Sequence, residues 1–186
     1  LEKINFMKKN FFITIFLILL FAQKSFAYSS DPKQFISEIV DEAKKILVES
    51  NSKEFKTKKL SEIALKTVDI VGVGYYSLGN YRKELSEAQM KEYLRLFEKY
   101  FLKSFTSRLA DYSDPKIEVL STEVLNSKYT IVKSLLLATD KKPEVKIEWR
   151  VYTKDPNKPL IRDLIIEGLS LARTQKEEFA SVIESN

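Results

Sequence analysis

The chain has 186 residues, with 31 Lys and Arg, 26 Asp and Glu, 4 Gly, no His and no Cys. This length suits one domain of ordinary size. The missing Cys and His exclude a disulfide framework, a thiol nucleophile, a Ser-His-Asp triad and a Cys/His zinc site. The glycines at 72, 74 and 79 lack the spacing of a dinucleotide-binding fingerprint.

Residues 1–27 have the layout of a secretory signal peptide, in which residues 1–6 form an upstream extension or an alternative start. A basic start at 7–10 is followed by twelve residues, 11–22, of which only Thr14 is polar, and small residues stand at 25 and 27. Twelve helical residues span about 18 Å, too short for a hydrocarbon core of about 30 Å. We therefore expect cleavage after Ala27 and export of residues 28–186 as a single domain. This part has 27 basic and 25 acidic residues, a balance that gives no electrostatic reason to bind nucleic acid.

The first half of the domain is predicted to be helical. Asp31, Pro32 and Gln34 form a helix start with a capping box, followed by apolar residues at helical spacing up to 47. A second helix is predicted over 55–66 and a short one within 68–81. A second capping box at 86–89 begins a long helix to about residue 109, with an apolar stripe made of Met90, Leu94, Phe97, Phe101 and Phe105.

The second half is predicted to form four β-segments, at about 116–125, 129–139, 144–153 and 160–171. Turn-like residues separate them, which favours an antiparallel meander. In the third segment, Val145, Ile147, Trp149 and Val151 alternate with polar residues and should share one face. Thr174 is predicted to cap a last helix. We expect an α+β fold, an NTF2-like or cone-like roll, in which helices pack on one face of a curled four-stranded sheet and enclose an internal apolar cavity.

Candidate catalytic groups are few. Asp111 with Asp114, or Asp163 with Glu167, could form a carboxylate pair, but both pairs occupy positions that a turn or a strand end explains. Asp163 is the best candidate because its neighbours in the strand are apolar. The nine tyrosines all follow residue 27, and several crowd between 75 and 100. This enrichment fits either an ordinary core or an apolar pocket with tyrosines at a wet mouth.

The order of five motifs resembles the MlaC-type family, also called the toluene-tolerance auxiliary component of an ABC transport system. The resemblance covers about residues 32–184. The motifs are Val-Asp-Ile at 68–70, Leu-Gly-Asn-Tyr at 78–81, the 86–89 box with Phe97, Phe101 and Tyr112, Asp163 with Ile-Glu-Gly-Leu-Ser-Leu at 166–171, and Lys-Glu-Glu-Phe at 176–179.

The resemblance implies a monomeric periplasmic carrier without catalytic activity, cofactor or metal. Such a carrier would move a phospholipid between an outer-membrane lipoprotein complex and an inner-membrane ABC transporter with its substrate-binding ring, and so maintain outer-membrane lipid asymmetry. The alternatives are a carrier of a hopanoid or another lipid, an exported NTF2-like enzyme, and an adaptor with a solid core.

The predicted lipid-binding residues combine the sheet face, the long helix and the aromatic segment before it. They are Tyr76, Leu78, Tyr81, Phe97, Phe101, Phe105, Val145, Ile147, Trp149, Leu164 and Ile166, with Tyr76, Leu78 and Tyr81 nearer the mouth.

Overall fold

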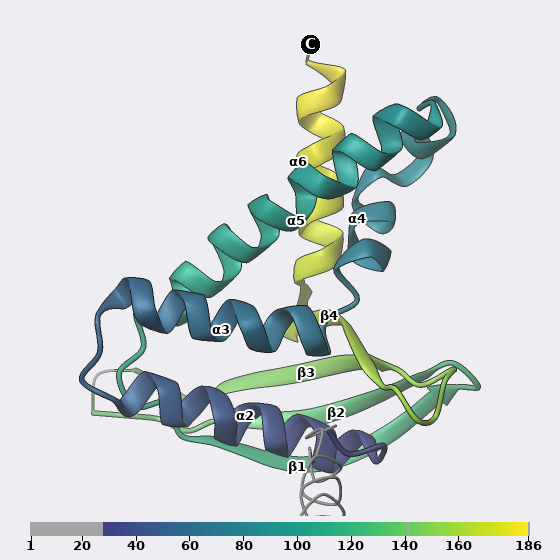
Figure 1. Ribbon diagram of the computed structural model, residues 1–186. Coiled ribbons are helices and arrows are strands. Elements are labelled where there is room, and N and C mark those ends of the chain that lie inside the picture. Colours follow the sequence, from purple (N-terminus) through teal and green to yellow (C-terminus); the bar gives the residue numbers. More distant parts are fainter. Residues whose placement is uncertain (1–27, 141, 186) are drawn as a thin grey trace, which may run out of the picture.

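The structure is a computed structural model that describes residues 28–140 and 142–185 (Figure 1). The predicted signal peptide lies outside these residues. The helical half contains α2 (Pro32–Val48), α3 (Lys53–Thr67), α4 (Ile70–Leu78), the 3-10 helix η1 (Gly79–Lys83) and α5 (Glu87–Leu109). The second half contains β1 (Ile117–Asn126), β2 (Tyr129–Leu136), β3 (Val145–Tyr152), β4 (Leu160–Ile166), β5 (Leu169–Ser170) and α6 (Leu171–Glu184).

The helix starts follow their capping residues. The Asp31 carboxylate accepts a hydrogen bond from the Gln34 backbone N–H, with Pro32 in the first helical position. The capping box predicted at Ser86 is confirmed, because the side chains of Ser86 and Gln89 each accept from the other's backbone N–H. Helix α3 begins before the predicted residue 55, because Ser52 caps it through the N–H of Phe55.

The glycine-rich segment 70–78 is a helix that packs closely against α5. A Cβ at the buried Gly74 would stand 3.0 Å from Cδ1 of Phe97, so glycine allows the two helices to approach. Tyr93 of α5 donates a hydrogen bond of 3.1 Å to the Gly74 carbonyl. Gly74 therefore serves the packing of α4 on α5.

The strands form the predicted antiparallel meander in the order β1-β2-β3-β4-β5. The fourth predicted segment, however, is two strands instead of one. Glu167 and Gly168 have φ angles of 49° and 82°, and such a pair of left-handed residues makes a tight hairpin turn. The chain therefore reverses after Ile166, and β5 adds a short fifth strand to the sheet.

The last helix begins earlier than predicted. The Ser170 hydroxyl accepts a hydrogen bond of 3.1 Å from the Arg173 backbone N–H, so α6 starts at Leu171. Thr174 lies inside the helix, where its hydroxyl donates to the Ser170 carbonyl. The cap at Thr174 was wrong because the hairpin turn brings a better-placed capping residue to the end of β5.

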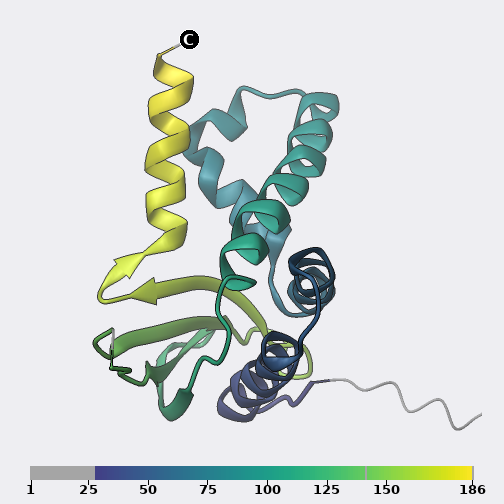
Figure 2. The ribbon, with the colours of Figure 1, turned by 90° about the vertical axis from the view of Figure 1, so that its left-hand side faces the viewer.

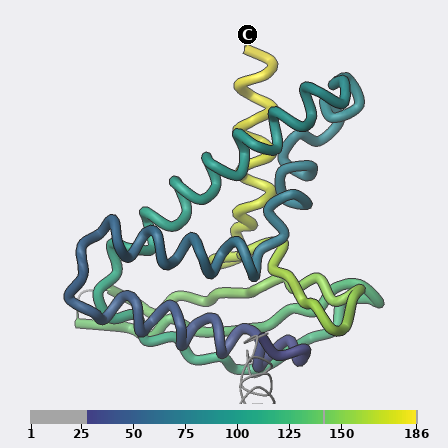
Figure 3. The backbone as a smooth tube through the Cα atoms, viewed as in Figure 1, coloured from purple at the N-terminus to yellow at the C-terminus, as the bar shows by residue number. Residues whose placement is uncertain are grey.

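The helices form two groups relative to the sheet. Helix α2 lies on one face of the sheet, and α3 runs antiparallel to α2 and packs on α2 and on α5 (Figures 1 and 3). Helices α4, α5 and α6 rise away from the sheet and pack on one another (Figure 2), and we call these three helices the arm. No helix in the described part of the chain has the length and apolar character needed to cross a bilayer.

Each group has its own apolar core. The main core joins α2 and α3 to the sheet around Phe35, Ile36, Val132 and Val151, which are at most 1% exposed. The arm core gathers Ile70, Val73 and Phe97, with Phe179 of α6 packed against them. The candidate site lies between these two cores.

Candidate functional site

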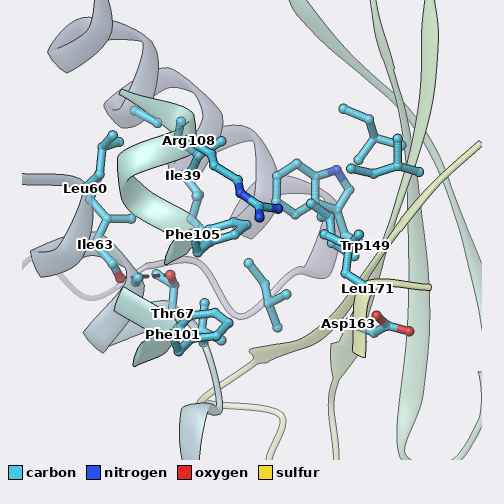
Figure 4. Close-up of a pocket in the computed structure, with 18 of the residues that line it drawn as sticks. Ile39, Leu60, Ile63, Thr67, Phe101, Phe105, Arg108, Trp149, Asp163 and Leu171 are labelled. Atoms are coloured by element: carbon cyan, nitrogen blue, oxygen red, sulfur yellow. Dashed lines mark hydrogen bonds between the residues drawn. The ribbon is translucent and has the colours of Figure 1, made fainter. Parts of the chain in front are cut away.

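A cavity of about 480 Å³ opens between the two cores. Its wall is built mainly from α2, α3, α5, the first turns of α6, and strands β3 and β4 (Figure 4), with one residue each from α4, β1 and β2. Ligand-binding pockets in proteins have volumes of roughly 300–1,000 Å³, so the cavity is large enough for a small ligand or part of a larger one.

Strand register determines the sheet side of the wall. Ile147 of β3 pairs with Ile166 of β4, and Trp149 pairs with Leu164. Paired residues in adjacent strands point to the same face, and all four side chains line the cavity.

The α5 side of the wall is an aromatic row. Phe97, Phe101 and Phe105 are four residues apart and lie on one side of the helix. Their rings stack in sequence, with centroid distances of 6.2 Å and 5.4 Å. Ser104 and Arg108 continue this side of α5 into the last turn of the helix, and both also line the cavity.

Polar atoms on the wall are mostly engaged inside the protein. The Trp149 indole N–H donates a hydrogen bond of 2.8 Å to the Ser134 hydroxyl. The Thr67 hydroxyl donates to the Ile63 carbonyl at 2.9 Å (Figure 4). Hydrogen bonds made within the wall leave mainly carbon facing the interior, which favours an apolar ligand.

Asp163 lines the cavity, but its carboxylate is occupied by structural contacts. It accepts hydrogen bonds from the Ser170 hydroxyl at 2.7 Å and the Ala172 N–H at 3.0 Å, and lies 3.5 Å from an Arg150 nitrogen. These contacts hold the first turn of α6 on β4. In the described residues, no group of acidic side chains is arranged to hold a metal ion.

Arg162 is anchored in a similar way. Its guanidinium donates to the Asp69 carboxylate at 2.6 Å and to the Tyr129 hydroxyl at 2.8 Å. It also lies over the Tyr152 ring, 3.6 Å from the centroid. Asp69 caps α4 in turn, so this network joins the arm to the sheet beside the cavity.

Comparison with known proteins places this architecture in a family. The profile of the MlaC protein family matches residues 35–186. The chain belongs to the MlaC family. A solved structure of a phospholipid-binding protein from Ralstonia solanacearum, in complex with a phospholipid, has the same fold, with a TM-score of 0.67 and 19% sequence identity. The match covers 81% of this chain and 86% of that chain. A search of the curated proteins found no match.

Seven of the eleven predicted site residues come together in this cavity of the MlaC-family chain. They are the three phenylalanines of α5 with Ile147, Trp149, Leu164 and Ile166. The other four lie outside its lining. Leu78 is buried in α4, and Val145 begins β3 beyond the end of the wall. Tyr76 lies under the Lys176 ammonium group of α6, and Tyr81 donates to Glu184 near the end of that helix.

The prediction missed the part of the wall that α2, α3 and α6 provide. Periodicity shows which face of α2 or α3 is apolar, but a wall and a solid core produce the same stripe. The position of Arg108 had a usable signal, since it stands three residues after Phe105 on the aromatic side of α5. The missed residues from these three helices are Ile39, Val40, Ala43, Lys44, Leu47, Leu60, Ile63, Ala64, Thr67, Leu171, Ala172, Thr174, Gln175 and Glu178.

Proposed function

We propose that this protein is a phospholipid carrier that holds the acyl chains of its lipid in the cavity between sheet, α2, α3 and α5. The observation that supports this most directly is the cavity of about 480 Å³ with an aromatic row on one side and aliphatic strand residues on the other. The wall presents an apolar surface that acyl chains can pack against. Family membership and the phospholipid complex of the Ralstonia solanacearum protein support the same function.

The physics of acyl chains gives such a protein its task. Two C16 chains contain roughly 28 CH₂ groups, and exposing each to water costs about 0.8 kcal/mol, on the order of 20 kcal/mol in total. A phospholipid therefore does not cross an aqueous compartment at a useful rate by itself. We propose that the carrier works in the periplasm and exchanges lipid with an inner-membrane ABC transporter and an outer-membrane lipoprotein complex, which would maintain outer-membrane lipid asymmetry.

The test is to identify what the purified protein contains. Native mass spectrometry of protein from the periplasm, followed by lipid extraction, should find one two-tailed phospholipid per chain. A bound hopanoid would mean that the protein is a lipid carrier with a different ligand. An empty chain that also fails to take up phospholipid from vesicles would contradict the proposed function.

A blocking substitution locates the lipid. Ile147→Trp places a larger side chain into the cavity, whereas Val145→Trp places it on the same strand, two residues away and outside the lining. We expect Ile147→Trp to lower the phospholipid content severalfold while Val145→Trp leaves it unchanged. Thermal unfolding of both variants checks that each is folded. Equal lipid content in the two folded variants would show that the lipid lies elsewhere.

A further inference from the structure

Five charged side chains line the cavity, and three of them have partners within the protein. Asp163 and Arg162 take part in the networks described above, and the Glu178 carboxylate accepts a hydrogen bond of 3.3 Å from the Gln175 side chain. The remaining two charged side chains are Lys44 and Arg108.

Lys44 and Arg108 are both cations without a counter-charge. Among the residues that the structure describes, neither side chain makes an ion pair, a hydrogen bond or a contact with an aromatic ring. Lys44 is half-buried on the side of α2 that carries Ala43 and Leu47 into the wall. Arg108 is exposed, and its guanidinium extends from α5 toward the side of the cavity where Trp149 lies (Figure 4). Lys44 and Arg108 therefore bring positive charge to the cavity that no ion pair in the described residues neutralises, and the lining also contains one carboxylate, Glu178, whose partner is the neutral Gln175 amide.

The surroundings make an anion the matching ligand group. Lys44 is half-buried beside an apolar wall, so its ammonium group is less screened than a cation in bulk water and attracts an opposite charge more strongly, whereas the exposed Arg108 contributes mainly through the geometry of its hydrogen-bond donors. The planar guanidinium can donate two parallel hydrogen bonds to a phosphate, and an ammonium adds a mobile point charge. Arg108 also stands in the last turn of α5, where a cation interacts favourably with the helix dipole. If that were its only role, its replacement would change the stability of the protein and not its choice of lipid.

We propose that Lys44 and Arg108 bind the anionic oxygens of the lipid, namely the phosphodiester, at the polar end of the cavity. The proposal rests on the carrier function above and adds a selection rule. Of two lipids with identical chains, the carrier takes the one with a phosphodiester and discriminates against the neutral one. A fatty-acid carboxylate has the same oxygen chemistry, so the experiment separates the two sources.

The experiment measures lipid choice. The full-length mature protein, stripped of lipid, is incubated with phosphatidylcholine vesicles that contain equal amounts of dioleoylphosphatidylglycerol and dioleoylglycerol. The lipid bound to re-isolated protein is then quantified by mass spectrometry. We expect the wild type to prefer the phospholipid, and Arg108→Met to reduce the ratio about tenfold, the effect of losing a charge-assisted hydrogen bond. Lys44→Met should act in the same direction, and Arg108→Lys should retain most of the preference.

A matched control uses the same helix. Lys103 lies on α5, is exposed and is outside the lining, so Lys103→Met should leave the ratio unchanged. Unaltered ratios in folded Arg108→Met and Lys44→Met would overturn the inference and leave the carrier function intact, whereas a wild type that takes up no lipid from the vesicles, phosphatidylcholine included, would overturn the carrier function. If Arg108→Met does not fold, the lipid ratios of Lys44→Met and Arg108→Lys test the inference in its place. In a parallel arm with oleic acid in place of the phospholipid, a dependence on these cations seen only there would overturn the phosphodiester assignment.

Discussion

The tyrosines of this protein differ in what their hydroxyl groups contact. Tyr93 is packed between the arm helices, where its ring meets Phe97 and Phe179 and its hydroxyl reaches the Gly74 carbonyl. Burial raises the pKa of the Tyr93 phenol well above its ordinary value. Tyr100 and Tyr112 are exposed and line the cavity, whereas Tyr76 and Tyr81, which were predicted to lie near its mouth, are outside the lining.

The raised pKa of Tyr93 predicts a loss of stability at high pH. Because the folded state keeps the phenol neutral, its contribution is complete below the ordinary tyrosine pKa of about 10 and is lost as the pH rises through the folded-state value. Tyr93→Phe should lower the free energy of unfolding at neutral pH by about 1 kcal/mol, the worth of its hydrogen bond. Urea unfolding from neutral to alkaline pH should show a shallower decline for Tyr93→Phe than for the wild type. Parallel declines would contradict this role for burial.

At the scale of elements, Asp163 connects the sheet to the last helix. Strand β4 carries the carboxylate, and the residues that it contacts, Ser170 and Ala172, stand on either side of the start of α6. The Arg162–Asp69 ion pair and the hydrogen bond of 2.9 Å from the Asp69 N–H to the Ile161 carbonyl also attach the arm to the sheet. Because α6 forms part of the cavity wall, these attachments also position the wall.

Replacement of Asp163 should therefore lower the stability of the fold, and we expect it to abolish no enzymatic activity. Asp163→Asn removes the charge and one acceptor, and we expect a loss of about 1–3 kcal/mol in the free energy of unfolding. Asp114→Asn, at an exposed position, is the control and should be neutral. Urea unfolding measures both. A hydrolase or isomerase activity that vanished in a stable Asp163→Asn protein would contradict the carrier function.

At the scale of the whole molecule, the residues that follow the predicted cleavage site are attached to the domain. The Tyr28 hydroxyl hydrogen-bonds to Glu42, and its ring packs edge-on against Phe35 at 5.8 Å. The Ser29 N–H donates to the Glu38 carboxylate at 2.8 Å. Both contacts are made by residues beyond Ala27, so the predicted cleavage would leave them in the mature chain.

Cleavage after Ala27 is the corresponding prediction. N-terminal sequencing of the protein from the periplasm should read Tyr28 first. Changing Ala27 to Lys should block processing, because the cleavage site needs small residues, and the longer chain should stay with the membrane fraction. Periplasmic protein that begins at Leu1 or Met7 would contradict the prediction.

Much of the fold followed from local rules that the sequence carries by itself. Asp31 and Ser86 begin their helices as predicted, because a cap needs only a side chain and an N–H three residues away. The alternation in β3 places Ile147 and Trp149 on one face, since successive side chains in a strand point to opposite sides. The resemblance to the MlaC family was also readable without coordinates, and the match of the family profile to residues 35–186 confirms the family.

Only the tertiary structure decided where the cavity lies and which polar groups face it. Tyr76 and Tyr81 contact α6 and do not line the cavity. The Asp163 carboxylate holds the first turn of α6, and Arg108 lines the cavity. A stripe of apolar residues predicts burial, but elements distant in the chain determine whether the stripe packs against other side chains or lines a cavity. Packing of the arm against the sheet supplies that information, and it arises from contacts that no local pattern encodes.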